Sequence, residues 1–349
     1  MVHKVFKEKG QDMEYQKEND KKITISDVAD ALGVSKTTVS RAISGKGRIG
    51  TETRERVLAY IKEHNYKPNA LAKGLAQLKT YNIGVMLPED YTLVDLPFFQ
   101  TCLMGISEVA VSMDYDILLT MGRENENTQL MRMVENHKVD GIILMRTFTK
   151  DESIEYLQKA GIPFVTVGST NYTDVVQIDN DHKNACRELI SILLMKKMRR
   201  IGIVGGIESH VVTQSRLNGY LEAYENAGLA IEKDIIFVNA DREAMIERAV
   251  EKLLEAKVDC IACLDDAVCM QVLNKLRKEN VRVPEEVKVA SFYDSSILDS
   301  HMPSITSLSF NVRELGMTVC HTLLDMIEGK QVEQRTLLGY EVILKESTK

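Results

Sequence analysis

Short polar and cationic side chains occupy five of the six positions from 36 to 41: Lys36, Thr37, Thr38, Ser40 and Arg41. An arginine or lysine can bond the acceptor edge of guanine or a phosphate, and a hydroxyl can bond base edges and phosphate oxygens. Val39 and Ala42 lie at positions that a helix would turn away from the polar run. On one face of a helix, these residue types are suited to reading the edges of DNA bases.

Two short helices joined through a glycine would position that face. Apolar residues recur at helical spacing over the first of them: Ile25, Val28, Ala29 and Leu32. Gly33 then permits a tight turn, and Ser35 has the side chain of an N-cap for a second helix over residues 36–43. The pattern predicts a helix-turn-helix, whose second helix enters the major groove of DNA.

A third helix is predicted from Thr51, as its N-cap, to about residue 64. Val57, Leu58 and Ile61 would form its apolar face and close a small core against the first two helices. Pro68 ends this domain, because the residue before a proline is pushed out of the helical region.

Several motifs of this segment resemble, in order, the headpiece of the lactose/galactose repressor family of bacterial transcription regulators. They are T-I-x-D-V-A at 24–29, G-V-S at 33–35, T-V-S-R at 38–41, T-R-E-R-V at 53–57 and Y-x-P-N-x-x-A-x-x-L-A at 66–76. The resemblance implies two sets of DNA-binding residues. The first set lies in the helix-turn-helix: Thr24, Ser35, Lys36, Thr37, Thr38, Ser40 and Arg41. The second set follows it: Asn69, Ala72, Lys73 and Leu75.

The second set belongs to a short helix predicted over residues 70–76, which resembles the hinge helix of that family. So short a helix is not stable alone in water, and Gly74 costs about 1 kcal/mol relative to alanine. The resemblance implies that two hinges fold together on the operator and that Leu75 enters the minor groove there. We therefore expect a homodimer and a near-palindromic operator.

The 349 residues fit a headpiece and a two-lobed body, since about 100–200 residues make one domain. We predict a disordered polar arm over 1–22, a helix-turn-helix DNA-binding domain over 23–68 and a hinge helix and linker over 69–80. An effector-binding and dimerisation domain would occupy 81–349. Met13, shortly before the basic pair at 21–22, is an alternative start of translation.

The net charge of the chain is unevenly distributed. The whole chain carries −7, which alone would argue against a nucleic-acid partner. Residues 21–80, however, hold 12 Lys/Arg and 5 Asp/Glu, whereas residues 81–349 hold 28 Lys/Arg and 41 Asp/Glu. The headpiece therefore attracts phosphates, while the acidic body repels DNA.

Other classes of protein are disfavoured by composition. The chain has no run of about 20 apolar residues to span a membrane, and its first residues lack the apolar region of a secretory signal. Six cysteines are scattered, and Cys260 and Cys263 sit in an apolar run, where a thiol is normally a small buried hydrophobe. We therefore expect reduced thiols, no metal site, no cofactor and a cytoplasmic location.

After residue 80 the sequence alternates between apolar strands and amphipathic helices. Strands are predicted at 83–87, 115–119, 141–145, 163–167, 175–178, 200–204, 234–238, 260–264, 287–292 and 304–308. Helices fill most of the gaps, including 99–113, 126–137, 183–196, 215–227, 242–256 and 267–279. The alternation predicts an α/β body with two parallel sheets covered by helices. The same family resemblance, looser here, implies two lobes similar to periplasmic sugar-binding proteins, with a ligand cleft between them.

Ligands of open α/β sheets bind at the carboxyl ends of strands. Together with the resemblance, this predicts the following effector-binding residues: Phe98, Phe99, Asp179, Arg216, Asp265, Tyr293 and Asp294. Carboxylates and arginine offer paired hydrogen bonds to vicinal hydroxyls, and a flat aromatic ring covers the apolar face of a sugar. The pattern favours a neutral carbohydrate held mainly by Arg216, Asp265 and Asp294.

The expected function is a sequence-specific DNA-binding transcriptional regulator, a repressor of carbohydrate-utilisation genes controlled by a small-molecule effector. Four departures from the family pattern leave the effector open. Tyr293 stands where the family has an aspartate, Asp265 where it has asparagine, Gly168 where it has an acidic residue and Lys197-Met198 where it has Gly-His. Tyr293, Gly168 and the S-F-Y-D-S run at 291–295 lean toward the maltose-regulator branch.

Alternatives of the same fold are a purine- or nucleotide-responsive regulator and one controlled by a protein partner. An enzyme fused to a DNA anchor is disfavoured, because the sequence has no nucleophile elbow, phosphate loop or His/Cys metal spacing. The operator sequence, the sense of the ligand response and the choice between dimer and tetramer stay open.

Overall fold

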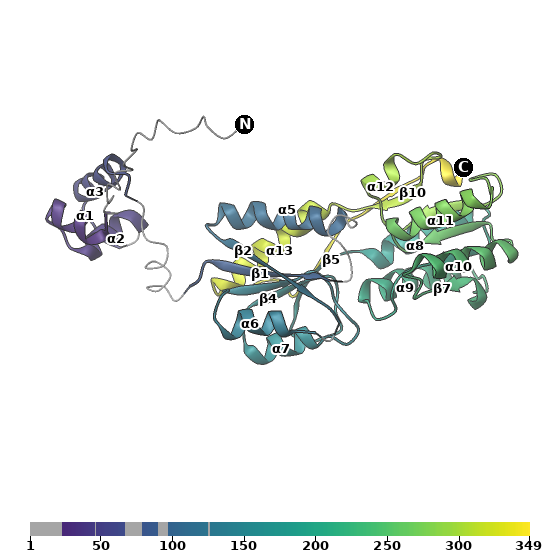
Figure 1. The fold of residues 1–349 in the computed structure, drawn as a ribbon, viewed down its shortest axis with the longest axis horizontal. Helices are drawn as coiled ribbons and strands as arrows, with labels where there is room; N and C mark the ends of the chain where they lie inside the picture. Colours follow the sequence, from purple (N-terminus) through teal and green to yellow (C-terminus); the bar gives the residue numbers. More distant parts are fainter. Residues whose placement is uncertain (1–22, 46, 67–78, 90–96, 125) are drawn as a thin grey trace, which may run out of the picture. The chain divides into compact units, whose positions relative to one another are not determined.

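The computed structural model describes residues 23–45, 47–66, 79–89, 97–124 and 126–349. The chain divides into two compact units, 1–79 and 80–349 (Figure 1). The predicted arm over 1–22 and the predicted hinge helix, with Asn69, Ala72, Lys73 and Leu75, lie outside the described residues.

The headpiece contains the three predicted helices, α1 (Ile25–Leu32), α2 (Lys36–Ser44) and α3 (Thr51–Glu63). Thr24 caps α1 in a capping box with Asp27, whose carboxylate accepts a hydrogen bond from the Thr24 amide at 2.7 Å. Gly33 ends α1 in the left-handed conformation with φ 65°. Ser35 caps α2 by accepting a hydrogen bond from the Thr38 amide at 3.1 Å. The sequence prediction of the helix-turn-helix is confirmed.

The prediction for α3 was wrong in two details. Its N-cap is Gly50, and Thr51 is already the first helical residue. Leu58 is 43% exposed, so the headpiece core does not use it. That core consists of the following buried residues: Val28, Ala29, Val39, Ala42, Val57 and Tyr66.

The first lobe of the body is a sheet with strand order β11-β5-β4-β3-β1-β2. These strands are β1 (Asn82–Pro88), β2 (Asp116–Gly122), β3 (Gly141–Leu144), β4 (Phe164–Val167), β5 (Val176–Asn180) and β11 (Arg335–Leu338), all paired in parallel. Helices α5 (Pro97–Ser112) and α13 (Val312–Ile327) pack on one face. Helices α6 (Thr128–Glu135) and α7 (Glu152–Ala160) pack on the other (Figure 1).

The second lobe is a sheet with strand order β12-β10-β9-β8-β6-β7. Its strands are β6 (Ile201–Val204), β7 (Ile236–Phe237), β8 (Cys260–Cys263), β9 (Lys288–Ser291), β10 (Thr306–Ser309) and β12 (Glu341–Ile343), of which β12 alone pairs antiparallel. Helices α8 (His182–Met195) and α9 (Val211–Asn226) cover one face. Helices α10 (Glu243–Glu255) and α11 (Asp266–Lys278) cover the other, and α12 (Ser296–Asp299) is short.

The chain passes between the lobes three times within residues 80–349, after β5, after β10 and between β11 and β12. The first passage follows Asp179-Asn180 at the end of β5. The expected α/β body with two parallel sheets is therefore confirmed. Apart from small shifts at their ends, the predicted strands are present.

Two predicted segments differ more. Residues 233–235 form a 3-10 turn, which shortens the strand predicted at 234–238 to β7. Helix α9 begins at Val211 rather than near residue 215, so Arg216 lies in its second turn and not at its start. No described helix is long and apolar enough to cross a membrane.

Candidate functional site

Helix α2 presents one polar face to solvent. Lys36, Thr37, Ser40 and Arg41 are exposed, whereas Val39 and Ala42 on the opposite face are buried. The hydroxyls of Ser35 and Thr38 lie 2.9 Å apart and bond to each other, so part of their hydrogen-bonding capacity goes into capping the helix. The exposed face thus carries four polar side chains, on a helix whose N-terminus is capped.

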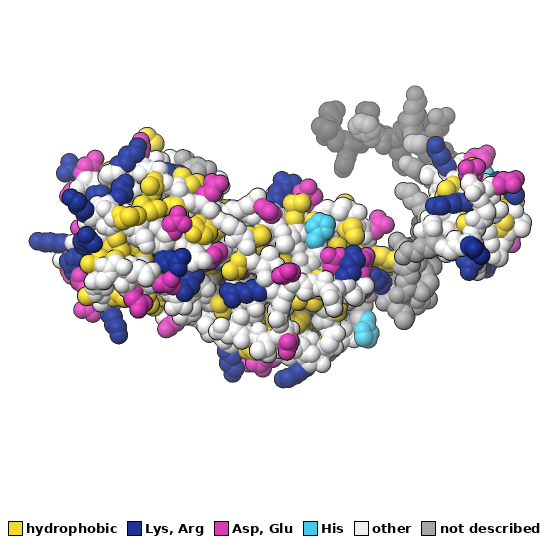
Figure 2. Space-filling view, turned by 180° about the vertical axis from the view of Figure 1, so that it is seen from behind, with side chains coloured by type: hydrophobic (Ala, Val, Ile, Leu, Met, Phe, Trp, Pro, Cys, Tyr) yellow, Lys and Arg dark blue, Asp and Glu magenta, His cyan; other side chains and the backbone are white. Residues whose placement is uncertain are grey.

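The chain after α2 packs closely beside Arg41. Gly47 has φ +91°, and a Cβ added there would lie 3.2 Å from Arg41 Cδ and Nε. A glycine is needed here, because a side chain would be strained and would displace the arginine. Lys and Arg side chains project at several points from the visible face of the headpiece (Figure 2). This arrangement suits contact with phosphates and base edges.

A cavity of about 180 Å³ lies between the two lobes, where the carboxyl ends of strands from both sheets meet. A water-sized site needs only about 10–15 Å³ on this measure, so the cavity has room for a small organic molecule. The first lobe contributes mainly apolar residues, including Pro97, Phe98, Phe99, Met145 and Val167. The second lobe contributes most of the polar ones, including His182, Arg216, Asp265, Asp266, Gln271 and Tyr293. The structure therefore brings six of the seven predicted effector residues to one cleft.

Arg216 is held in place, but not all of its hydrogen-bond donors are used. Its Nη1 donates a hydrogen bond to the backbone carbonyl of Leu264, just after β8. Its Nε is buried and has no hydrogen-bond partner in the structure. Because an unpaired buried donor is costly, this nitrogen is a strong candidate for contact with a ligand.

The two aspartates that follow β8 have different environments. Asp265 caps α11, and its Oδ1 accepts a hydrogen bond from the Val268 amide at 2.8 Å. Asp266 is only 2% exposed, and its Oδ1 accepts a hydrogen bond from the Ala267 amide at 3.0 Å. Burial raises the pKa of Asp266, a hydrogen bond with Ser295 opposes that shift, and the neighbouring charge of Asp265 adds to it. Both side chains have one carboxyl oxygen that is not used in capping or turn formation.

Asp179, in contrast, is fully engaged within the protein. Its Oδ2 accepts hydrogen bonds from the amide and the hydroxyl of Ser169 at 2.8 and 2.9 Å. Its Oδ1 accepts one from the Asn180 amide at 2.8 Å. Burial raises the pKa of Asp179, and these hydrogen bonds oppose that shift. Asp179 lines the cleft but mainly fixes the loop between β4 and β5.

His182 was not predicted as a site residue. It starts α8, is 5% exposed and lines the cleft. Its Nε2 lies 3.5 Å from Asp179 Oδ1, and its Nδ1 has no partner. Burial, followed by the charge of Arg216, holds the pKa of His182 well below its usual value. The imidazole is therefore neutral at physiological pH.

Aromatic rings from both lobes meet at the cleft. Phe98 meets Phe99 edge to face at 5.2 Å between ring centroids. It also meets Tyr293, from the second lobe, at 5.9 Å and 76°. Tyr293 is buried and stacks at 6.4 Å on Phe310. The structure therefore turns the Tyr293 ring toward Phe98.

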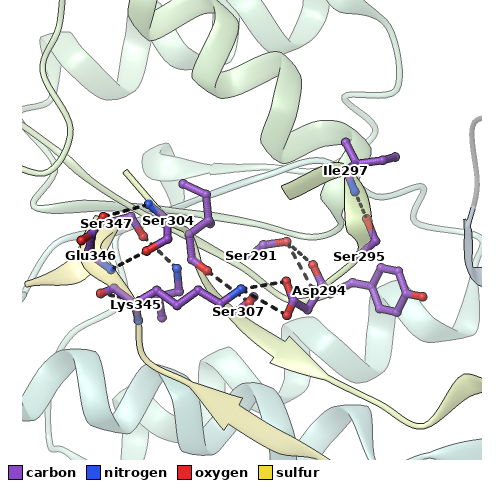
Figure 3. A network of polar contacts seen from close by, with 12 residues as sticks. Ser291, Asp294, Ser295, Ile297, Ser304, Ser307, Lys345, Glu346 and Ser347 are labelled. Carbon is purple, nitrogen blue, oxygen red and sulfur yellow. Dashed lines mark hydrogen bonds and ion pairs between the residues drawn. The ribbon is translucent and has the colours of Figure 1, made fainter. Parts of the chain in front are cut away.

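Asp294 is the predicted residue that the structure does not bring to the cleft. It is absent from the cavity lining, and both its oxygens lie 3.3 Å from Lys345 Nζ (Figure 3). Lys345 begins the last segment of the chain, in which Ser347 Oγ donates to the Val289 carbonyl at 2.6 Å and accepts from the Thr306 amide at 2.9 Å. Asp294 thus fastens that segment to the second lobe, and we remove it from the predicted binding residues.

The backbone conformation at Gly168 explains why a glycine stands where the family has an acidic residue. Its φ is +110°, and an added Cβ would lie 3.1 Å from Thr147 Oγ1. An acidic side chain would be strained in this backbone conformation. Residues that sequence reasoning missed include Gln271 and His182. Gln271 gave no local signal.

Models of known protein families match both units of the chain. The family model described as "Bacterial regulatory proteins, lacI family" matches residues 24–69. That described as "Periplasmic binding proteins and sugar binding domain of LacI family" matches residues 80–344.

Among curated proteins, the HTH-type transcriptional regulator MalR of Streptococcus pneumoniae serotype 4 (strain ATCC BAA-334 / TIGR4) is 31% identical over 93% of this chain and 99% of its own length. Among solved structures, the transcriptional regulator CelR–cellobiose complex has a TM-score of 0.72 at 27% identity, covering 93% of this chain and 99% of that one. The Lac repressor dimer bound to operator and the anti-inducer ONPF has a TM-score of 0.78 at 22% identity, with the same coverage, and shares the fold.

Proposed function

Since this chain belongs to the lacI family of bacterial regulatory proteins, we propose that it is a repressor of carbohydrate-utilisation genes whose DNA binding a sugar controls. It is a DNA-binding transcriptional regulator. The observation that carries the proposal is the cleft of the second unit, where polar side chains and aromatic rings line one cavity. A ring-shaped ligand with hydroxyl groups matches both features.

The chemistry of the cleft favours a neutral ligand. Arg216 supplies a donor, whereas Asp265 and Asp266 supply carboxyl oxygens that an added phosphate would face at close range. Like charges placed together disfavour the complex, so a free sugar should bind better than a nucleotide. Two relatives point the same way, because one is named MalR and another was solved with cellobiose.

For DNA, we propose that the exposed face of α2 reads base edges in the major groove, with Arg41 as its principal contact. The hinge residues Asn69, Ala72, Lys73 and Leu75 would add contacts, Leu75 in the minor groove. The Lac repressor, which shares the fold, is bound to its operator as a dimer. We accordingly propose that this chain acts as a homodimer on a near-palindromic operator, in the cytoplasm and without catalysing a reaction.

The test of DNA reading is Arg41→Ala, measured on an operator selected from random DNA and on an unrelated duplex. A base contact contributes about 1–3 kcal/mol of discrimination, so binding to the selected operator should fall at least fivefold more than binding to the unrelated duplex. Lys62→Ala removes an exposed charge from α3 and is the control for general electrostatics. Equal losses on both duplexes for Arg41→Ala would show that this side chain does not read bases.

A further inference from the structure

Gln271 is a cleft residue to which neither the family match nor the proposed sugar site gives a role. It lies in the second turn of α11, four residues after Ala267, so the two share one helix face. Ala267, Val268 and Gln271 all line the cavity. The side-chain carbonyl Oε1 of Gln271 is buried and has no hydrogen-bond partner among the residues that the structure describes.

One other side chain of the second lobe shares this property at the same cavity. His182 Nδ1 is buried and has no hydrogen-bond partner among the described residues, on a side chain that is 5% exposed. Its Nε2 lies 3.5 Å from Asp179 Oδ1, and the residue lines the cavity.

Gln271 on α11 and His182 on α8 therefore both line the cavity and both carry a buried polar atom without a partner among the described residues. Buried polar atoms in folded proteins are nearly always paired, so an unpaired set at a cavity marks the place where a ligand completes the hydrogen bonds. Acceptors are completed by O–H or N–H donors. Arg216, which donates, is the complementary group in the same lobe.

We propose that Gln271 is a specificity-determining residue of the ligand cleft, which with His182 binds the hydroxyl groups of a cyclic polyol. The ligand class is a neutral sugar with free hydroxyls on the edge that faces the second lobe, while its apolar face rests on Phe98. The inference rests on the proposed sugar-controlled function and adds the residue that selects among sugars. A sugar lacking the hydroxyl at Gln271 should bind less well.

The experiment uses the full-length chain and isothermal titration with maltose, cellobiose and glucose, and with monodeoxy derivatives of whichever sugar binds. Gln271→Met removes the acceptor at nearly constant shape, and Gln271→Glu keeps an acceptor but loses the amide donor. Asn274→Leu is the matched control, because Asn274 lies on the same helix outside the cavity lining and bonds Arg277 at 2.6 Å.

Gln271→Met should weaken binding about tenfold, as expected for one lost hydrogen bond with a buried partner left unpaired. Gln271→Glu should stay within about threefold of the wild type, and Asn274→Leu should bind like it. One monodeoxy derivative should bind the wild type about tenfold more weakly than the parent sugar, yet bind Gln271→Met as well as the parent does.

A merely structural role for Gln271 would weaken all derivatives equally, without this hydroxyl-specific loss. That result, or unchanged binding by Gln271→Met, overturns the inference and leaves the sugar-controlled function standing. If the wild type binds no neutral sugar at all, the proposed ligand class fails, and the assignment of Gln271 fails with it.

Discussion

The two walls of the cleft differ in chemistry, although both are built at the carboxyl ends of parallel strands. The wall from the first lobe is mostly apolar, with Phe98 and Phe99 at its centre, and its polar groups are already bonded within the lobe. Asp179 and Thr147, for example, both bond Ser169. The wall from the second lobe keeps unpaired polar atoms.

This difference indicates that the two walls have different roles in ligand recognition. An apolar wall contributes contact area that is similar for many sugars, whereas hydrogen-bonding groups discriminate strongly because a missing partner leaves a buried polar atom unpaired. The first lobe should therefore set overall affinity, and the second lobe should set which sugar is chosen. Each prediction below tests one wall against the other.

The largest effect should come from Arg216→Ala. This change removes the charged donor of the polar wall and should weaken ligand binding at least about tenfold, since a hydrogen bond to a charged group contributes about 1.5–3 kcal/mol. Operator binding without ligand should be unchanged, because the headpiece is a separate unit. Fluorescence anisotropy of labelled operator, with and without sugar, measures both, and Arg277→Ala on α11 is the control. A normal ligand response in Arg216→Ala would remove this residue from the site.

Phe98→Ala should have a smaller and less selective effect. Loss of the aromatic surface should weaken every sugar about three- to tenfold, leaving their order of preference unchanged. Phe98→Leu keeps an apolar side chain and controls for disturbance of the contacts with Phe99 and Tyr293. Titration with a sugar and its monodeoxy derivatives tests this. A change in the order of preference would contradict the assignment of selectivity to the second lobe.

Lys345→Met should lower the stability of the protein and leave its affinity for the ligand unchanged. It leaves the Asp294 carboxylate, 14% exposed, without its cationic partner, at a cost of about 1–3 kcal/mol in the free energy of unfolding. Urea denaturation measures this cost, and Asp294→Asn should show a similar loss. Sugar affinity should match the wild type in both variants. Weaker sugar binding by Asp294→Asn alone would return Asp294 to the polar wall.

The smallest effect concerns pH and His182. Its pKa is lowered in the folded protein, so below the unfolded pKa of about 6.5 the unfolded chain binds the extra proton and stability is lost as pH falls. Asp179 and Asp266, whose pKa values are raised, act in the opposite direction at lower pH. His182→Gln should therefore lose less thermal stability than the wild type between pH 7.5 and about 5.5. Parallel melting curves would show that His182 contributes nothing.

The headpiece was predictable because its signals are local. Ser35, Gly33 and the apolar spacing of α1 are read from neighbours in sequence, and each has the predicted role. Two details of α3 were missed. Its N-cap is Gly50 rather than Thr51, and Leu58 in the middle of the helix faces solvent. Caps and helix faces shift easily by one residue when several polar side chains stand together.

The cleft was only partly predictable because its residues meet through the fold. The ends of strands located it, but the chain bends after β9 at residues 292–293, and Tyr293 enters the cleft while Asp294 bonds Lys345 instead. Gln271 depends on the packing of α11 against the second sheet, which no neighbouring residue indicates. His182 depends on where the chain crosses between the lobes.

The central claim is that the cleft binds a neutral sugar and not a nucleotide. Thermal unfolding of the full-length wild type, measured with neutral mono- and disaccharides and separately with nucleobases, nucleotides and sugar phosphates, tests it most directly. A true ligand at a hundredfold excess over its Kd should stabilise the protein by about 2.7 kcal/mol. We predict that a neutral sugar raises the Tm and that nucleotides do not. Stabilisation by a nucleotide, with none by any sugar, would contradict the account.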